Sequence, residues 1–150
     1  MATGIGSATQ LSTFDTFKTV LSSNTVLSSA VDSDSYYEFE PNLKSGSFNG
    51  YPYIVVNTPQ LDNPEGTFDT LEFKENTVII ELVVEYHARS NYKTYANAVI
   101  QALETAESTL ETIGLYNTTV VHDGVAEEYM NQKQLVRGTF TVSHDGYVTR

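Results

Sequence analysis

Two copies of the tripeptide His-Asp-Gly are the segments of this chain whose residue types come closest to a chemical site. They lie at His122-Asp123-Gly124 and at His144-Asp145-Gly146. Imidazole and carboxylate groups are ordinary metal ligands, so the two pairs could together hold a metal ion. Their spacing matches no recognised zinc or iron site, and Asp-Gly is a favoured tight-turn sequence. We therefore interpret each histidine as the end of a strand and each Asp-Gly as a turn.

A second group with catalytic potential alternates along one face of an expected strand and consists of Glu81, Glu85 and His87. Neighbouring carboxylates can raise each other's pKa and act as general acid and base. No nucleophile motif accompanies them, and such residues more commonly form a solvated or subunit-contacting sheet face. We expect no enzymatic activity, no metal and no cofactor. A small cytosolic enzyme or ligand-binding domain remains the alternative.

The composition limits the classes of function that need considering. The chain has 150 residues, enough for one domain with a real core, and it contains no cysteine. Its 8 Lys+Arg against 19 Asp+Glu give a formal charge of -11, which argues against adhesion to nucleic acid. No apolar stretch approaches the ~20 residues of a membrane span, and we see no secretory signal. We expect a cytosolic protein, or one assembled into a particle in the cytosol.

The elements that must position these residues follow from the periodicity of apolar side chains. Helical spacing predicts helices over Leu11–Leu21 and Asn91–Ile113, with Gly114 as a stop signal. The apolar stripe of the longer helix should pack on the sheet; it consists of Tyr95, Val99, Leu103, Ala106 and Leu110. Expected strands cover Tyr53–Asn57, Thr77–His87, Tyr116–His122 and Leu135–His144, with a possible short strand at Tyr36–Phe39 and a polar connection over Glu127–Gln134.

These elements predict an α+β fold: one long helix packed on a mostly antiparallel sheet, with an N-terminal helix and a long loop before the central strand. Residues 1–10 are expected to form a flexible arm and residues 11–150 a single domain.

The expected loop over residues 58–76 is longer than most connections inside a compact domain. Its apolar residues are spaced too irregularly for a strand or helix and form a hypothetical partner interface: Leu61, Phe68, Leu71 and Phe73. Its acids suit a solvated rim or the wall of a channel: Asp62, Glu65, Asp69 and Glu72. We expect this loop to become ordered chiefly on assembly; the alternative is a loop that folds back on its own domain.

The order of elements resembles that of tail terminator or tail-completion proteins of long-tailed bacteriophages or related tailed viruses. The resemblance lies mainly in residues 50–145. Its carriers are the helix at Leu11–Leu21, the acid-rich loop before Asn76–Tyr86, the helix beginning Tyr92–Leu103 and the closing strand Gln134–Val142. The resemblance implies a small α+β subunit that forms a ring, usually a hexamer, at the head-facing end of the tail tube. It implies no catalytic residues.

On this resemblance the chain would be a virion protein of the tail–neck region, assembled in the host cytoplasm. It would cap the tail tube and join it to the head or neck, with the tail tube protein and a neck or connector protein as partners. Genomic DNA would pass through the ring without specific binding, because an acidic wall repels it. No membrane is involved. A neck or head-closure connector of the same kind of particle is the alternative.

Overall fold

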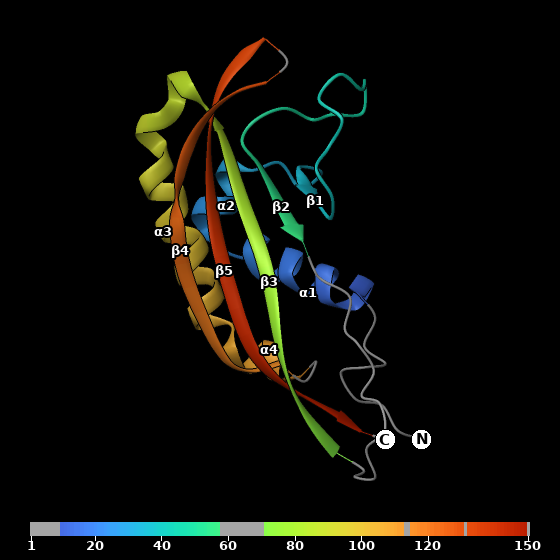
Figure 1. Ribbon diagram of the computed structural model, residues 1–150. Helices are drawn as coiled ribbons and strands as arrows, with labels where there is room; N and C mark the ends of the chain where they lie inside the picture. The colour runs from blue at the N-terminus through green and yellow to red at the C-terminus, as the bar shows by residue number, and fades with distance from the viewer. Residues whose placement is uncertain (1–9, 58–70, 113–114, 131, 150) are drawn as a thin grey trace.

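The computed structural model describes residues 10–57, 71–112, 115–130 and 132–149. They form an α+β fold in which helices cover one face of a five-stranded mixed sheet, which confirms the expected class (Figure 1). The helices are α1 (Gln10–Ser22), α2 (Thr25–Ala30), the 3-10 helix η1 (Tyr86–Asn91), α3 (Tyr92–Thr105) and α4 (Glu107–Glu111). The strands are β1 (Tyr36–Tyr37), β2 (Tyr53–Asn57), β3 (Leu71–Glu85), β4 (Leu115–Met130) and β5 (Lys133–Thr149).

The sheet has the strand order β1-β2-β3-β5-β4, so β1 and β4 form its two edges. The β1–β2 pair is parallel and the other three pairs are antiparallel. The ladder between β3 and β5 runs from Leu71 opposite Thr149 to Glu85 opposite Leu135. Figure 1 shows these two strands extending past the helical layer at one end. The long strands β3, β5 and β4 therefore form the frame on which the shorter elements pack.

The helix-covered face of the sheet is closed by apolar side chains. Alternate residues of β3 point into this core: Val78, Ile80, Leu82 and Val84. Val99, Leu103 and Leu110 meet them from α3 and α4 with no exposed surface. This confirms the helix face predicted from the three-and-four spacing, with Tyr95 packed at its margin.

The opposite face is partly closed by the covering loop, residues 38–52, which connects β1 to β2. Four residues are buried beneath it: Tyr53, Val55, Val83 and Leu135. The ring of Phe48 lies 5.2 Å from that of Tyr51 and 5.6 Å from that of Tyr53, each approaching edge-on. Edge-to-face contacts of this kind add to the stabilisation from buried area. Helices thus close one face of the sheet, and an aromatic loop covers part of the other.

The expected single helix over Asn91–Ile113 is divided. It begins as η1, becomes α3 at Tyr92 and is interrupted at Ala106, whose φ of −96° and ψ of 11° are not helical. Thr105 contributes to the break, because its hydroxyl donates to the carbonyl oxygens of Gln101 and Ala102. Side-chain hydrogen bonds of this kind compete with the regular helix.

The turn interpretation of the two His-Asp-Gly segments is wrong, because both lie inside long strands. In β4 the register shifts between His122 and Gly124, and Gly124 has φ +137°, so the segment forms a bulge that bends the strand without reversing it. In β5, Gly146 pairs with Lys74 of β3. The expected polar connection over Glu127–Gln134 is likewise mostly strand, because β4 extends to Met130 and β5 begins at Lys133, where the two strands pair.

The expected loop over residues 58–76 ends earlier than predicted. Residues 71–76 belong to β3, where Leu71, Glu72 and Phe73 pair with Thr149, Val148 and Tyr147 of β5. Cross-strand pairing with a distant segment supplies the regularity that the local sequence does not show. The other proposed loop residues lie outside the described residues: Leu61, Asp62, Glu65, Phe68 and Asp69. Positions 1–9 of the expected arm also lie outside them.

Candidate functional site

The densest charged cluster in the described part of the chain centres on Arg137 of β5, whose side chain is only 11% exposed. Its Nε donates to both carboxylate oxygens of Glu128 in β4, at 3.1 and 3.0 Å. Its Nη1 donates to Glu81 of β3 at 2.6 Å. Its Nη1 and Nη2 donate to the two oxygens of Glu40 in the covering loop, at 3.0 and 2.9 Å. We call these four residues the Arg137 clamp, since they join three strands and the covering loop.

The electrostatics within the Arg137 clamp favour the charged forms of Glu40 and Arg137. Burial alone would raise the pKa of Glu40, but hydrogen bonds from Arg137 and from the Tyr53 hydroxyl outweigh it and hold that pKa below its ordinary value. Burial and the 2.6 Å hydrogen bond to Glu40 raise the pKa of Tyr53. Burial opposes the charge on Arg137, yet hydrogen bonds to Glu40 and Glu128 raise the pKa of its guanidinium. These shifts favour the ionised forms of Glu40 and Arg137 and the neutral form of Tyr53, which keeps the hydrogen bonds among the three in one arrangement.

The structure separates the candidate acid–base group of Glu81, Glu85 and His87. Glu81 belongs to the Arg137 clamp. Glu85 pairs with Lys133 at 3.1 Å and with His87 at 3.3 Å, and the side chain of His87 is 78% exposed. The two carboxylates therefore serve different ion pairs.

The structure also keeps the two His-Asp pairs apart. His122 shares a 2.8 Å hydrogen bond with the hydroxyl of Tyr92, whereas His144 is buried and shares a 3.1 Å bond between its Nδ1 and the hydroxyl of Thr118. The carboxylate of Asp123 accepts a hydrogen bond from the Thr141 hydroxyl. Within the described ranges, no group of three or more His, Cys, Asp or Glu residues could hold a metal ion.

Sequence reasoning missed the close contact between Tyr92 and Gly138. A Cβ at position 138 would lie 1.5 Å from the Tyr92 hydroxyl, so the glycine makes room for the tyrosine against β5. Burial raises the pKa of Tyr92 to about 12. A glycine inside an otherwise β-branched strand was the available signal, since it often marks a close approach. This contact fixes the start of α3 on the sheet.

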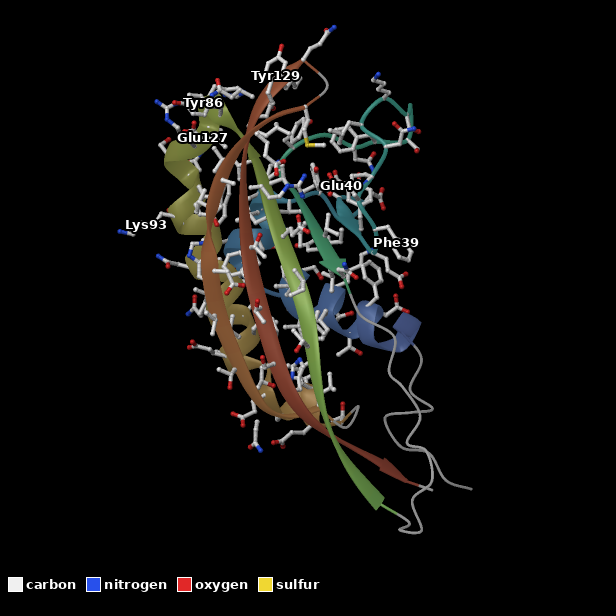
Figure 2. All side chains as sticks on the ribbon, viewed as in Figure 1. Phe39, Glu40, Tyr86, Lys93, Glu127 and Tyr129 are labelled. Carbon is white, nitrogen blue, oxygen red and sulfur yellow. The ribbon has the colours of Figure 1, made fainter. Side chains whose placement is uncertain are left out.

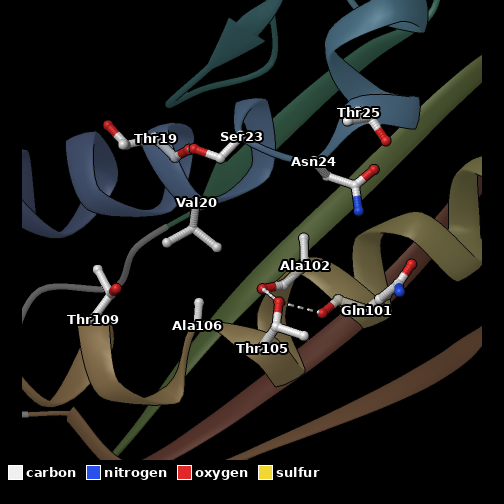
Figure 3. A pocket seen from close by; sticks show the side chains of 10 residues that line it. All are labelled: Thr19, Val20, Ser23, Asn24, Thr25, Gln101, Ala102, Thr105, Ala106 and Thr109. Atoms are coloured by element: carbon white, nitrogen blue, oxygen red, sulfur yellow. Dashed lines mark hydrogen bonds between the residues drawn. The ribbon is translucent and has the colours of Figure 1, made fainter.

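A groove of about 420 Å³ separates α1 and α2 from α3 and α4 (Figure 3). Its lining carries no charged side chain and consists of Thr19, Val20, Ser23, Asn24, Thr25, Gln101, Ala102, Thr105, Ala106 and Thr109. The hydroxyls of Ser23 and Thr105 donate to carbonyl oxygens of their own helices, at 2.7 and 2.9 Å. The groove thus presents uncharged side chains, and two of its hydroxyls, those of Ser23 and Thr105, already donate to backbone carbonyls.

The exposed large apolar residues of the described ranges gather at the edges of the sheet. Three lie on β4: Val121 is 51% exposed, Val125 50% and Tyr129 74%. The fourth, Phe39, is 73% exposed and lies two residues after β1, at the other edge. Figure 2 shows Tyr129 near the tip of the β4–β5 hairpin and Phe39 on the opposite side of the sheet.

No protein-family model matches the chain, and no curated protein matches it. None of the described helices is long and apolar enough to cross a membrane. The features that bear on function are therefore those of the fold itself: one face closed by helices, one face held by the Arg137 clamp, and two edges with exposed apolar side chains.

Proposed function

We propose that the chain is a structural protein of a tailed virus, a ring-forming tail terminator or completion protein that caps the tail tube and joins it to the head or neck. The observation that carries the proposal is edge strand β4. It is 16 residues long, and among the described strands it pairs with β5 alone. Three of its large apolar side chains, those of Val121, Val125 and Tyr129, are half exposed or more. Natural proteins usually shield such edges, so a contact with another subunit is the simplest reason for this one.

The order of elements supports the same proposal. A helix, a long central strand, a following helix and a closing strand make up the resemblance to tail terminators, and α1, β3, α3 and β5 occupy these positions. Closed rotational symmetry lets one patch of a subunit meet a different patch of the next until a ring closes. A hexamer is the stoichiometry that the resemblance implies.

The charge balance supports a passage for DNA without binding to it. The formal charge is -11, and Arg137, one of the 8 Lys and Arg residues, is surrounded by three carboxylates. A wall of like charge keeps a moving polyanion from adhering, and the effect should weaken as salt is added.

The test has two stages on the full chain. Native mass spectrometry and electron microscopy should show closed rings with a central opening. The chain should then be added to a polymerising tail tube protein of the same virus, and we expect shorter tubes with a ring at one end. Unchanged tube lengths and bare tube ends would overturn the terminator role. Binding to the portal or neck complex without binding to tubes would indicate a connector instead.

A further inference from the structure

The four exposed large apolar residues in the described part of the chain lie at the two opposite edges of a single sheet. Three are on β4 and one, Phe39, follows β1. A partner that covered one edge alone would leave the other exposed. A contact between the β4 edge of one copy and the β1 edge of the next would cover both kinds of surface with a single repeated interface.

We propose that copies of this chain associate head to tail through their sheet edges, with β4 of one copy against β1 and Phe39 of the next. The proposal rests on the ring-forming function above and deepens it by naming the two contacting surfaces. Such a contact is heterologous, so every subunit uses both edges and the series either closes into a ring or grows as a filament. A symmetric β4-to-β4 dimer, in contrast, would leave Phe39 exposed.

The exposed apolar side chains of β4 lie on both faces of the sheet, where they can contact a neighbouring strand edge from either face. Val121 pairs with Thr141 and points to the face carrying the covering loop, because its cross-strand neighbour does. Val125 pairs with Gly138 on the helix-covered face, where Tyr92 packs. Tyr129 lies on the same face as Val125, since successive even steps along a strand share a face. Exposed apolar side chains therefore lie on both faces of the sheet beside the outer backbone edge of β4: one on the loop face and two on the helix-covered face.

The charges at the two edges oppose this contact, so other interactions must stabilise it. Exposed acids lie at both edges: Asp123 and Glu127 on β4, and Asp32 and Asp34 just before β1. Like charges on both surfaces repel, so the attraction must come from apolar burial and from backbone hydrogen bonds across the edge. Added salt screens the repulsion over a Debye length of ~8 Å at physiological strength. Association should therefore strengthen as salt is raised.

The experiment uses one disabling variant at each edge of the full chain. Val125→Lys places a charge on the β4 edge, and Phe39→Asp places one beside β1. Matched controls on the outer side of α3 make the same changes of charge at exposed positions: Thr94→Lys and Asn97→Asp. Circular dichroism confirms that each variant is folded. Size-exclusion chromatography with light scattering then gives the mass of each variant alone and of mixtures.

We expect the wild type and both controls to form the same oligomer, and each edge variant to be monomeric. An equimolar mixture of Val125→Lys and Phe39→Asp should form a dimer and nothing larger. The intact β4 of the Phe39→Asp chain meets the intact β1 edge of the Val125→Lys chain, and both remaining edges are disabled. The dimer should bind at least tenfold more tightly than either variant binds itself.

If both edge variants still formed rings of the wild-type mass, the proposed contact surfaces would be wrong, although the chain would still form a ring. Loss of association with Val125→Lys but not with Phe39→Asp would indicate a symmetric β4 contact and would also overturn the proposal. So would a wild-type chain that stays monomeric in high salt up to about 1 mM. The tube-length assay then decides independently whether the terminator role fails as well.

Discussion

The two faces of the sheet are covered through different kinds of interaction. On the helix-covered face, Leu82 of β3 and Leu103 of α3 are fully buried in a continuous apolar core. On the other face, the covering loop lies over aromatic rings and is joined to the sheet by Glu40 and Arg137. Apolar burial is non-directional and roughly proportional to area, whereas a two-point guanidinium–carboxylate pair fixes both distance and orientation.

This difference separates stability from position. The helices have a wide apolar stripe and gain most of their stabilisation from burial. The covering loop has no regular structure, so its position depends on a few specific contacts, above all the Arg137 clamp. We therefore expect changes on the helix face to unfold the protein, and changes on the loop face to release the loop as well as weaken the fold.

The largest effect should come from Leu103→Ala, which removes a fully buried side chain from the helix-covered core. The lost apolar burial and the residual cavity should lower the free energy of unfolding by about 2–5 kcal/mol. Urea denaturation measures it. Its neighbour Glu104 is exposed, so Glu104→Ala should change the stability by less than about 0.5 kcal/mol. A cost for Leu103→Ala as small as that of the control would show that this face does not depend on apolar packing.

Arg137→Met should have the next largest effect, because it leaves three carboxylates facing one another without their cation. Removing one partner of a fully buried pair costs roughly 3–5 kcal/mol; here the carboxylates are partly exposed, and we expect about 2 kcal/mol. The rate of backbone hydrogen exchange should also increase more in the covering loop than in the strands of the sheet.

Lys133→Met is the matched control for Arg137→Met, since Lys133 lies on the same strand and its side chain is 52% exposed in its pair with Glu85. It should cost no more than about 1 kcal/mol. If exchange in the covering loop stayed at its wild-type rate in Arg137→Met, the clamp would not be what positions the loop.

Gly138→Ala tests the close approach of Tyr92 on the helix-covered face. The new Cβ would displace the Tyr92 ring and break its hydrogen bond to His122, at a cost of roughly 1–3 kcal/mol. In a Tyr92→Ala background the same change should cost much less. Gly46→Ala is the control, because a Cβ there meets nothing within 4 Å. Equal thermal shifts at both glycines would argue against the contact.

The smallest effect concerns acid and the covering loop. Glu40 has a lowered pKa in the folded state, so it stays ionised after its unfolded counterpart has taken up a proton. Its contribution is fully present above the unfolded value, ~4.3, and is lost as the pH falls through the lower folded value. Glu40→Gln should therefore flatten the acid limb of the stability profile. Glu38→Gln makes the same change on the same loop outside the clamp and is the matched control; equal acid limbs in the two variants would show that the clamp does not set this slope.

Part of this fold could be predicted from local sequence. The bounds of β2 are those expected, because the prolines on both sides of this β-branched run end the strand. The buried face of α3 followed from its spacing. Asp-Gly gave a wrong prediction because its turn preference is local, whereas pairing of β4 with β5 extends through both segments, one of which forms a bulge.

The Arg137 clamp could not be predicted from the sequence for a related reason. Arg137 lies 97 positions from Glu40 and 56 from Glu81. No spacing pattern connects residues so far apart, and each acid by itself is typical of a solvated surface. Only the strand order, which places β5 between β3 and β4, brings two of these acids beside the arginine.

The pairing of β3 with β5 also has a consequence during synthesis. The nearest ends of the two strands, joined by the pair of Lys133 with Glu85, are 48 positions apart. At ~5–20 residues per second, β3 waits about 2–10 s on the ribosome before its central partner emerges. The helices η1 and α3 follow β3 directly in the chain and can cover its apolar face within that interval. The helices η1 and α3, which later form part of the core, can thus first cover the apolar face of β3 while the edge that pairs with β5 still has no partner strand.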